Sequence, residues 1–403
     1  MSDSSPSRSS DPTILFIAIL SAVIALGPLA MQIFIPALPL IQQDFQTHPS
    51  LVQMALSLSM LSIAISMLIY GPLSDRFGRL PILKIGIGVC IIGSLICIWA
   101  STIEVLIIGR IIQAAGGAVG MVLARAMARD LYGAKSVRLI AILTMVMVIA
   151  PMLAPVLGGY LSDWVGWRYC FVFTAIAAVI ILILVYVRLQ ETHFKRLPMS
   201  SLTAMVREYG NLMLVPRYAG YVFFSAFASA VFFSFIALAP YVMANVLNRP
   251  PSEYGLYFML VSGAFMVGNS LAVRLADLVE SDRMIIFGAG FAISGTLVLA
   301  WMQWSGHLSV LALFLPVALA AFGNGMALPN SQAQAINVFP EHAGSASGLC
   351  GFIQQLIAAS FVQIGGFFSQ NSAWPLVGML LIAAIAGLGC LIYLFSLRPE
   401  TAR

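Results

Sequence analysis

Charged residues are scarce in this sequence. Asp, Glu, Lys and Arg make up 9% of the 403 residues, whereas hydrophobic residues make up 61%, and the mean hydropathy is +0.98. Soluble proteins carry about 25% charged residues, so this composition excludes a soluble globular protein. We expect an integral membrane protein in contact with a lipid bilayer.

Residues that bind metals or perform catalysis are also few and scattered. The four histidines are dispersed, and the cysteines lie in or beside apolar runs without metal-ligand spacing: Cys90, Cys97, Cys170, Cys350 and Cys390. No Ser/His/Asp order and no phosphate-binding glycine loop occur at a suitable place. We therefore expect neither an enzyme nor a bound cofactor or metal.

Apolar runs of some twenty residues recur along the whole chain. Each is long enough for a helix that crosses ~30 Å of hydrocarbon, and their continuity excludes a barrel, whose strands alternate in hydrophobicity. The sequence predicts an all-α integral membrane protein with twelve spans: 14–38, 52–72, 82–101, 104–125, 138–160, 168–188, 218–242, 255–273, 284–304, 309–331, 346–368 and 374–396.

The longest polar stretch divides these spans into two groups of six. Two bundles joined in parallel are typical of transporters in which a site near the midplane is exposed to each side in turn. The first residues lack the features of a signal peptide, so the first span should remain. The predicted segments are a tail at 1–13, a bundle at 14–188, a linker at 189–217, a bundle at 218–396 and a tail at 397–403.

Basic residues indicate the orientation of the spans. With the N-terminus inside, seventeen of the 20 Lys and Arg residues fall at cytoplasmic loops or helix ends. Arg168 and Arg249 fall outside and Arg110 lies within a span, so the positive-inside rule is satisfied. The net charge of +5 therefore reflects topology, and no nucleic-acid partner is expected. We predict a multi-pass protein of a bacterial inner membrane with both termini in the cytoplasm.

The loop after the second span reads GPLSDRFGR and places one acid and two bases within a few residues. Any polytopic protein needs a positively charged inside loop, but this spacing is more specific. It resembles the hallmark of the major facilitator superfamily, G-x-L-x-D-R-x-G-R, although Leu80 stands where a further base is common. The matching residues include Gly71, Asp75, Arg76, Gly78 and Arg79.

The resemblance implies that Asp75 closes the cytoplasmic side. Asp75 would pair with basic residues and face the positive N-terminal end of the eleventh helix, which is expected to begin near Ser345. The end of the fourth span offers further partners, namely Arg125, Arg129 and Asp130.

Arg110 lies inside the fourth span. An arginine there costs about 2.5 to 3.5 kcal/mol on insertion scales, so it is expected to face a partner or a water-filled cavity. With Gln113 and Gly116 it fits the R-x-x-Q-x-x-G pattern of the same superfamily. We interpret Arg110 and Gln113 as candidate substrate or coupling residues. The alternative is that Arg110 simply ties helices together.

The fifth span carries APMLAPVLGG, residues 150–159. Pro151 and Pro155 each remove a backbone donor and bend the helix, while Gly158 and Gly159 let a neighbouring backbone approach. The stretch resembles the G-P-x-x-G-G signature of exporters in the superfamily, with an alanine in place of its first glycine.

Two further stretches, GWRYCF at 166–171 and ALPNSQAQA at 327–335, extend this pattern over nearly the whole chain. Together they resemble the branch that includes the bicyclomycin and chloramphenicol exporters. The resemblance implies multidrug efflux by an antiporter, and hence antibiotic resistance.

The first span departs from that branch, whose first helix usually reads D-x-x-x-P-A-L-P. The aspartate is implicated in proton coupling and in recognition of cationic drugs, but here the stretch is QIFIPALP and Gln32 takes its place. Glutamine cannot bind or release a proton. Coupling to a proton gradient would then run through Glu104, through Asp75 or through a charged substrate, and the sequence favours none of these.

Gln32 and Arg110 are expected to meet. On these spans both lie about six residues from the outer end, or ~9 Å below the outer surface. Pro36 and Pro39 lack an N–H, which leaves the carbonyls of Gln32 and Ile35 to accept from Arg110 together with the Gln32 amide oxygen. Without a neighbouring carboxylate, Arg110 keeps a positive charge that should favour neutral or anionic small molecules over cationic ones.

The leading hypothesis is a secondary active transporter that exports a small amphipathic molecule by alternating access and acts as a monomer. A dedicated exporter of one metabolite or siderophore would share every motif, and an uptake or facilitative transporter would share the fold. A membrane enzyme or channel would require a catalytic cluster or a continuous polar pore lining, and the sequence shows neither.

Overall fold

The computed structural model of the chain describes residues 14–192, 202–368 and 371–397. The predicted tails, apart from residue 397, lie outside these ranges. Twelve helices in the described ranges are long and apolar enough to cross a membrane, and the same ranges contain no strand. The predicted all-α fold with twelve spans is confirmed.

The long helices form two bundles. The N-terminal bundle comprises α1 (Ile14–Gln32), α2 (Leu38–Asp44), α3 (Pro49–Phe77), α4 (Arg79–Ile98), α5 (Ile103–Tyr132), α6 (Val137–Trp164) and α7 (Arg168–Arg188). The C-terminal bundle comprises α9 (Pro216–Tyr241), α10 (Pro251–Leu275), α11 (Ser281–Trp304), α12 (Val310–Asn337), α13 (Ala343–Gly366) and α14 (Trp374–Ser396). A short helix, α8 (Leu202–Met213), lies between them in the sequence.

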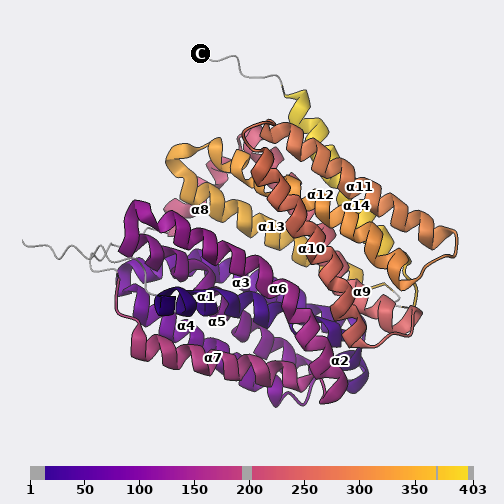
Figure 1. Cartoon of the computed structure of the whole chain (residues 1–403), viewed down its shortest axis with the longest axis horizontal. Coiled ribbons are helices and arrows are strands. Elements are labelled where there is room, and N and C mark those ends of the chain that lie inside the picture. The colour runs from indigo at the N-terminus through magenta and orange to yellow at the C-terminus, as the bar shows by residue number, and fades with distance from the viewer. Residues whose placement is uncertain (1–13, 193–201, 369–370, 398–403) are drawn as a thin grey trace, which may run out of the picture.

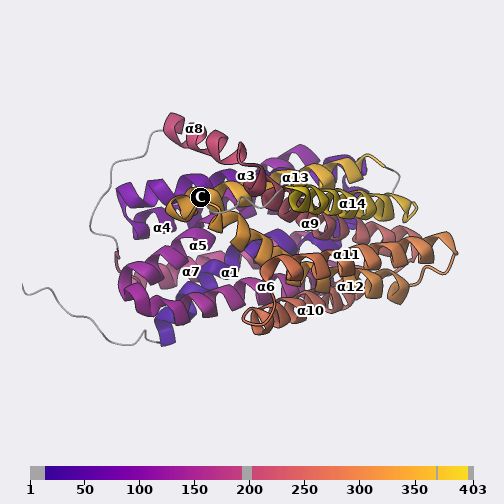
Figure 2. The same ribbon diagram turned by 90° about the horizontal axis from the view of Figure 1, so that it is seen from above.

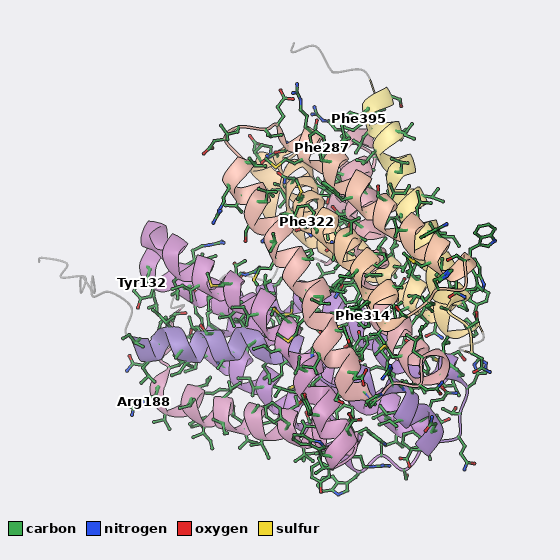
Figure 3. All side chains as sticks on the ribbon, turned by 45° about the vertical axis from the view of Figure 1, so that its right-hand side comes forward. Tyr132, Arg188, Phe287, Phe314, Phe322 and Phe395 are labelled. Carbon is green, nitrogen blue, oxygen red and sulfur yellow. The ribbon has the colours of Figure 1, made fainter. Side chains whose placement is uncertain are left out.

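The two bundles meet at one end and diverge at the other. We call the side on which α1 begins and α14 ends the terminal face, and the opposite side the distal face. In Figure 1 the distal ends meet near α2 and α9, while the terminal ends point in different directions. Figure 3 agrees with this arrangement. Tyr132 and Arg188, at the terminal ends of α5 and α7, lie on the N-terminal bundle, well apart from Phe395 of α14 on the C-terminal bundle.

Two helix pairs join the bundles, since α3 packs on α13 and α6 packs on α10. Two glutamines make further cross-bundle hydrogen bonds near the distal face, Gln53 from α3 to α9 and Gln363 between α13 and α3. Gln53 Nε2 donates to the carbonyl of Ala237 at 2.7 Å. Gln363 accepts from Ser57 Oγ at 2.9 Å and donates through Nε2 to the carbonyl of Ser50 at 3.1 Å. These bonds hold the distal ends together.

The first span is less regular than predicted. A continuous helix is expected over 14–38, but α1 ends at Gln32, a short 3₁₀ turn follows at Ile35–Ala37, and α2 carries the span on to Asp44. Pro36 and Pro39 lack an N–H and interrupt the α-helical hydrogen bonds. The carbonyl of Ile35 accepts instead from the N–H of Leu38, in the tighter 3₁₀ pattern.

The loop between α6 and α7 holds α2 in place. Asp44 Oδ2 accepts from Trp167 Nε1 at 3.1 Å and from Arg168 Nη1 at 2.8 Å. Arg168 Nη2 also donates to the carbonyl of Ala100 at 3.2 Å. The GWRYCF stretch therefore fixes the distal end of the broken first span to its own bundle.

The polar linker predicted at 189–217 contains the helix α8, which lies at the edge of the molecule outside both bundles in Figure 2. Glu208 of α8 pairs with His342 Nδ1, at the start of α13, over 2.9 Å. This pair ties the described part of the linker to the terminal face of the C-terminal bundle.

Candidate functional site

Arg110 is the centre of a buried polar cluster in the N-terminal bundle. Its side chain, in the distal third of α5, is 0% exposed. Nη1 donates to the carbonyl of Ala30 in α1 at 2.8 Å and to Oε1 of Gln113, one turn further along α5. Gln113 Nε2 in turn donates to Ser94 Oγ in α4 at 2.8 Å. The cluster therefore connects three helices.

Close backbone packing brings these helices within reach of Arg110. A Cβ atom on Gly27 of α1 would lie 2.7 Å from the carbonyl oxygen of Gly117 in α5. A Cβ atom on Gly116 would overlap the backbone of Cys90 in α4. The small residues that follow Arg110 in the sequence thus let α1 and α4 approach α5 closely enough for direct hydrogen bonds.

Aromatic rings also surround the charge of Arg110. Its Cζ lies 3.9 Å from the centre of the Phe34 ring and 5.9 Å from that of Phe171. Both distances allow a cation–π interaction. In the described ranges Arg110 contacts two rings, a carbonyl and an amide, and its Nε and Nη2 have no hydrogen-bond partner there. These two donors are unsatisfied in the described conformation.

The predicted hydrogen bond between Arg110 and Gln32 is wrong. Arg110 bonds Ala30 instead, and within the described residues the buried Oε1 of Gln32 has no partner. Successive helical residues are about 100° apart, so residue 32 lies about 160° around the helix from residue 30. The depth estimate also fails, because the span continues past residue 38 to Asp44 and Gln32 lies deeper than assumed.

Glu104 lies apart from this cluster. It occupies the first turn of α5, at the distal face, and is exposed, whereas Arg110 is buried. The structure therefore places the candidate coupling acid at the surface and the candidate arginine in the interior.

Arg79 is the centre of a second polar cluster, at the terminal face. Its Nη1 lies 2.6 Å from Asp75 Oδ1, and its Nε lies 2.9 Å from Asp130 Oδ2. Nη1 also donates to Ser74 Oγ at 2.6 Å. One buried arginine, the first residue of α4, thus links the end of α3 with the end of α5, so the structure brings three of the predicted gate residues together.

The other predicted gate residues make different contacts. Arg125 Nη2 donates to the sulfur of Met147 in α6, and Arg129 is exposed. The guanidinium of Arg76 lies 5.2 Å from the ring of Phe77. Asp75, in the last turn of α3, forms an ion pair with Arg79, the first residue of α4.

Glu191 completes the terminal cluster and was not expected from the sequence. Its carboxylate accepts from the backbone N–H groups of Arg79 and Leu80 at 3.0 and 3.1 Å, and so caps the start of α4. Gly78 precedes this helix with φ of 101°, and a Cβ atom there would lie 2.5 Å from the Glu191 carboxylate. A signal for this contact was present, because the α4 N-terminus has no side-chain cap of its own.

The two glycines of the fifth-span motif contact different bundles. A Cβ atom on Gly158 would overlap the carbonyl of Ile33, just after the break in the first span. A Cβ atom on Gly159 would lie 2.6 Å from the carbonyl oxygen of Pro251 at the start of α10. Both prolines of the motif, Pro151 and Pro155, lie inside α6. The motif therefore packs on the first span on one side and on the C-terminal bundle on the other.

Two six-helix bundles of membrane-spanning helices, with a buried arginine cluster inside the first bundle, are typical of a membrane transport protein. Residues 20–363 match the family profile of the Major Facilitator Superfamily, and the chain belongs to this superfamily. The predictions of the superfamily and of a transporter rather than an enzyme are confirmed.

Several curated proteins are similar over most of the chain. Multidrug resistance protein D of Escherichia coli (strain K12) is 28% identical, over 87% of this chain and 88% of that protein. The bicyclomycin resistance protein homolog of Haemophilus influenzae is 25% identical, over 91% and 92%. The chloramphenicol resistance protein of Pseudomonas aeruginosa is 26% identical, over 93% and 90%. The predicted resemblance to this branch is confirmed.

Solved structures show the same fold. The xylose transporter XylE from E. coli, in a partially occluded inward open conformation, matches with a TM-score of 0.74 and 16% identity. The match covers 97% of this chain and 99% of that structure.

Proposed function

We propose that this protein exports small amphipathic molecules by alternating access, and that it favours neutral or anionic molecules over cationic ones. The names of the similar drug, bicyclomycin and chloramphenicol resistance proteins support export. Gly159 of the fifth-span motif packs closely on α10 of the other bundle. This contact supports alternating access in which the interface between α6 and α10 opens and closes.

The observation that carries the charge preference is the setting of Arg110. Its guanidinium is buried, two of its nitrogen atoms lack a hydrogen-bond partner in the described ranges, and α1, whose Ala30 carbonyl it contacts, contains no acidic residue. A hydrogen bond to a charged group contributes about 1.5 to 3 kcal/mol. An acceptor on a neutral or anionic substrate would gain this energy, whereas a cation would be repelled.

We place the terminal face in the cytoplasm of a bacterial inner membrane, on the support of the positive-inside distribution. In this orientation the described conformation, with diverging terminal ends, faces inward. We propose that the protein works as a monomer without a bound cofactor and uses the proton gradient. Because Gln32 cannot titrate, the charge of the substrate would contribute to coupling.

The test is flux across proteoliposomes with an imposed pH gradient, using chloramphenicol as the neutral probe, fluorescein as the anion and ethidium as the permanent cation. We expect flux of the first two compounds and slow ethidium flux. Replacing Arg110→Gln should lower anion transport about tenfold or more, because it removes one charged hydrogen bond. Arg110→Lys, which keeps the charge, should retain part of the anion flux.

Robust ethidium export, together with unchanged fluorescein flux in Arg110→Gln, would refute the charge preference. Flux that does not respond to the imposed gradient would exclude obligatory proton antiport.

A further inference from the structure

Helix α10 begins without a cap of its own. Its N-cap residue is Pro250, whose side chain cannot accept a hydrogen bond, and Pro251 follows. The first N–H groups of a helix need acceptors, which Ser, Thr, Asp or Asn usually supply. Thr102 does so for α5 and Ser309 for α12, each within its own bundle. The start of α10 must obtain its acceptor elsewhere.

Asp163, at the distal end of α6, is that acceptor. Its Oδ2 accepts from the backbone N–H of Ser252, in the first turn of α10, at 3.0 Å. A carboxylate at a helix N-terminus is stabilised by the helix dipole as well as by the hydrogen bond. Because α6 belongs to the N-terminal bundle and α10 to the C-terminal bundle, this helix cap crosses the bundle interface.

The cap exists only while the distal ends are together. One turn before Asp163, Gly159 packs so closely on α10 that a Cβ atom would lie 2.7 Å from the Cα of Ser252. An N–H···O hydrogen bond is lost once donor and acceptor separate by more than about 3.5 Å. A small movement of α6 away from α10 therefore breaks the cap and leaves the Ser252 N–H without this partner.

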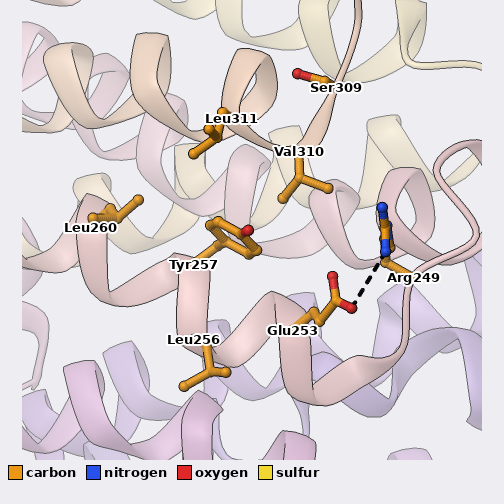
Figure 4. Close-up of a pocket in the computed structure, with 8 residues that line it drawn as sticks. All are labelled: Arg249, Glu253, Leu256, Tyr257, Leu260, Ser309, Val310 and Leu311. Carbon is orange, nitrogen blue, oxygen red and sulfur yellow. Dashed lines mark ion pairs between the residues drawn. The ribbon is translucent and has the colours of Figure 1, made fainter.

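The charged neighbours do not replace Asp163. Glu253 follows Ser252 but pairs with Arg249 over 3.6 Å, as the dashed line in Figure 4 marks. Arg168, the first residue of α7, pairs with Asp44 at 2.8 Å. Both nearby arginines thus pair with an acid other than Asp163, which contacts the start of α10.

We propose that Asp163 is a positioning residue of the transport cycle, which stabilises the conformation with closed distal ends by capping α10 across the bundle interface. The proposal rests on the proposed alternating access. It assigns the residue a role in the balance between conformations rather than in substrate binding.

The test measures that balance in purified full-length protein in lipid nanodiscs. Spin labels at exposed positions Gln43 and His307 report the distal separation, and labels at Leu131 and Leu278 report the terminal separation. Replacing Asp163→Ala removes a cap, which should shift the ratio of the two conformations about fivefold towards open distal ends. Asp163→Asn keeps an acceptor and should shift the ratio less.

Two variants separate this role from simple stabilisation. Ser309→Ala removes a cap at the same face but within one bundle, and should leave the ratio unchanged. Pro250→Ser supplies α10 with its own acceptor, since residue 250 has the extended backbone of an N-cap (φ −72°, ψ 158°). In that background, Asp163→Ala should no longer shift the ratio.

An unchanged ratio in Asp163→Ala, or the same shift in Ser309→Ala, would overturn the proposal. The measurement needs no substrate, so a failure of this proposal can be distinguished from a failure of the proposed function. A shifted ratio without export would refute export alone, and normal export with an unchanged ratio would refute the cap alone.

Discussion

Replacing Gly159→Ala should open the distal interface without unfolding either bundle. The new Cβ would lie 2.6 Å from the carbonyl oxygen of Pro251, and ordinary contacts begin at 3.4 Å, so α6 and α10 must separate by the difference, about 0.8 Å. Overpacking of this kind costs about 1 to 3 kcal/mol. Opening the distal ends relieves the strain, so we expect the conformational ratio to shift about 5- to 150-fold.

The neighbouring glycine is the matched comparison. In Gly158→Ala the new Cβ would overlap the carbonyl of Ile33, which belongs to the same bundle. Movement of one bundle against the other cannot relieve that overlap. We therefore expect Gly158→Ala to lower the melting temperature with little change in the conformational ratio. Gly378→Ala, in α14, meets no atom within 4 Å and should change neither property.

The same spin-label pairs give the ratio, and thermal unfolding in detergent gives the stability. The reasoning would be refuted if Gly158→Ala and Gly159→Ala had the same effects on both measurements. It would also be refuted if Gly159→Ala left the distal distance unchanged while Gly378→Ala altered it.

Three further substitutions test the remaining clusters. Gln32→Asp places a carboxylate at the position where the related branch has one. Ethidium flux and its dependence on the pH gradient should therefore rise. If neither rises, residue 32 does not set the charge preference. Asp75→Asn removes one of the two carboxylates that pair with Arg79. Transport should fall while the amount of protein in the membrane stays normal. Unchanged transport would refute a gating role. Glu191→Ala removes the acceptor for two N–H groups of α4 and should cost about 1 kcal/mol of stability, measured by thermal unfolding, whereas Glu191→Gln should cost less.

The fold could be predicted because each span is encoded locally. A run of twenty apolar residues must form a helix in lipid, since no water is present to satisfy its backbone groups. The same argument does not give the shape of the first span, because this apolar run contains two prolines that interrupt the helix. The end at residue 38 was wrong because α2 remains apolar enough to extend the span to Asp44.

The candidate site was predicted only in part, because its contacts depend on tertiary packing. Arg110 was identifiable as a charge within a span, and its reach to the first helix was expected. The identity of its partner was not, since helix rotation decides between Ala30 and Gln32. Glu191 was missed for a different reason. It lies far along the chain from Arg79, and only the packing of α7 beside α4 brings it to the helix start.

Arg110 does not need a carboxylate to be stable in the bundle. Its insertion cost is about 2.5 to 3.5 kcal/mol. Its two hydrogen bonds, each to a charged donor, contribute about 1.5 to 3 kcal/mol apiece, and a desolvated cation–π contact with Phe34 contributes about 2 kcal/mol. Together these contributions are similar in size to the insertion cost plus the cost of leaving Nε and Nη2 without partners, about 1 to 3 kcal/mol each. Neutral acceptors and an aromatic ring thus hold the Arg110 guanidinium in the bundle without an acid at residue 32, and under the proposed function Nε and Nη2 would donate to an acceptor on the substrate.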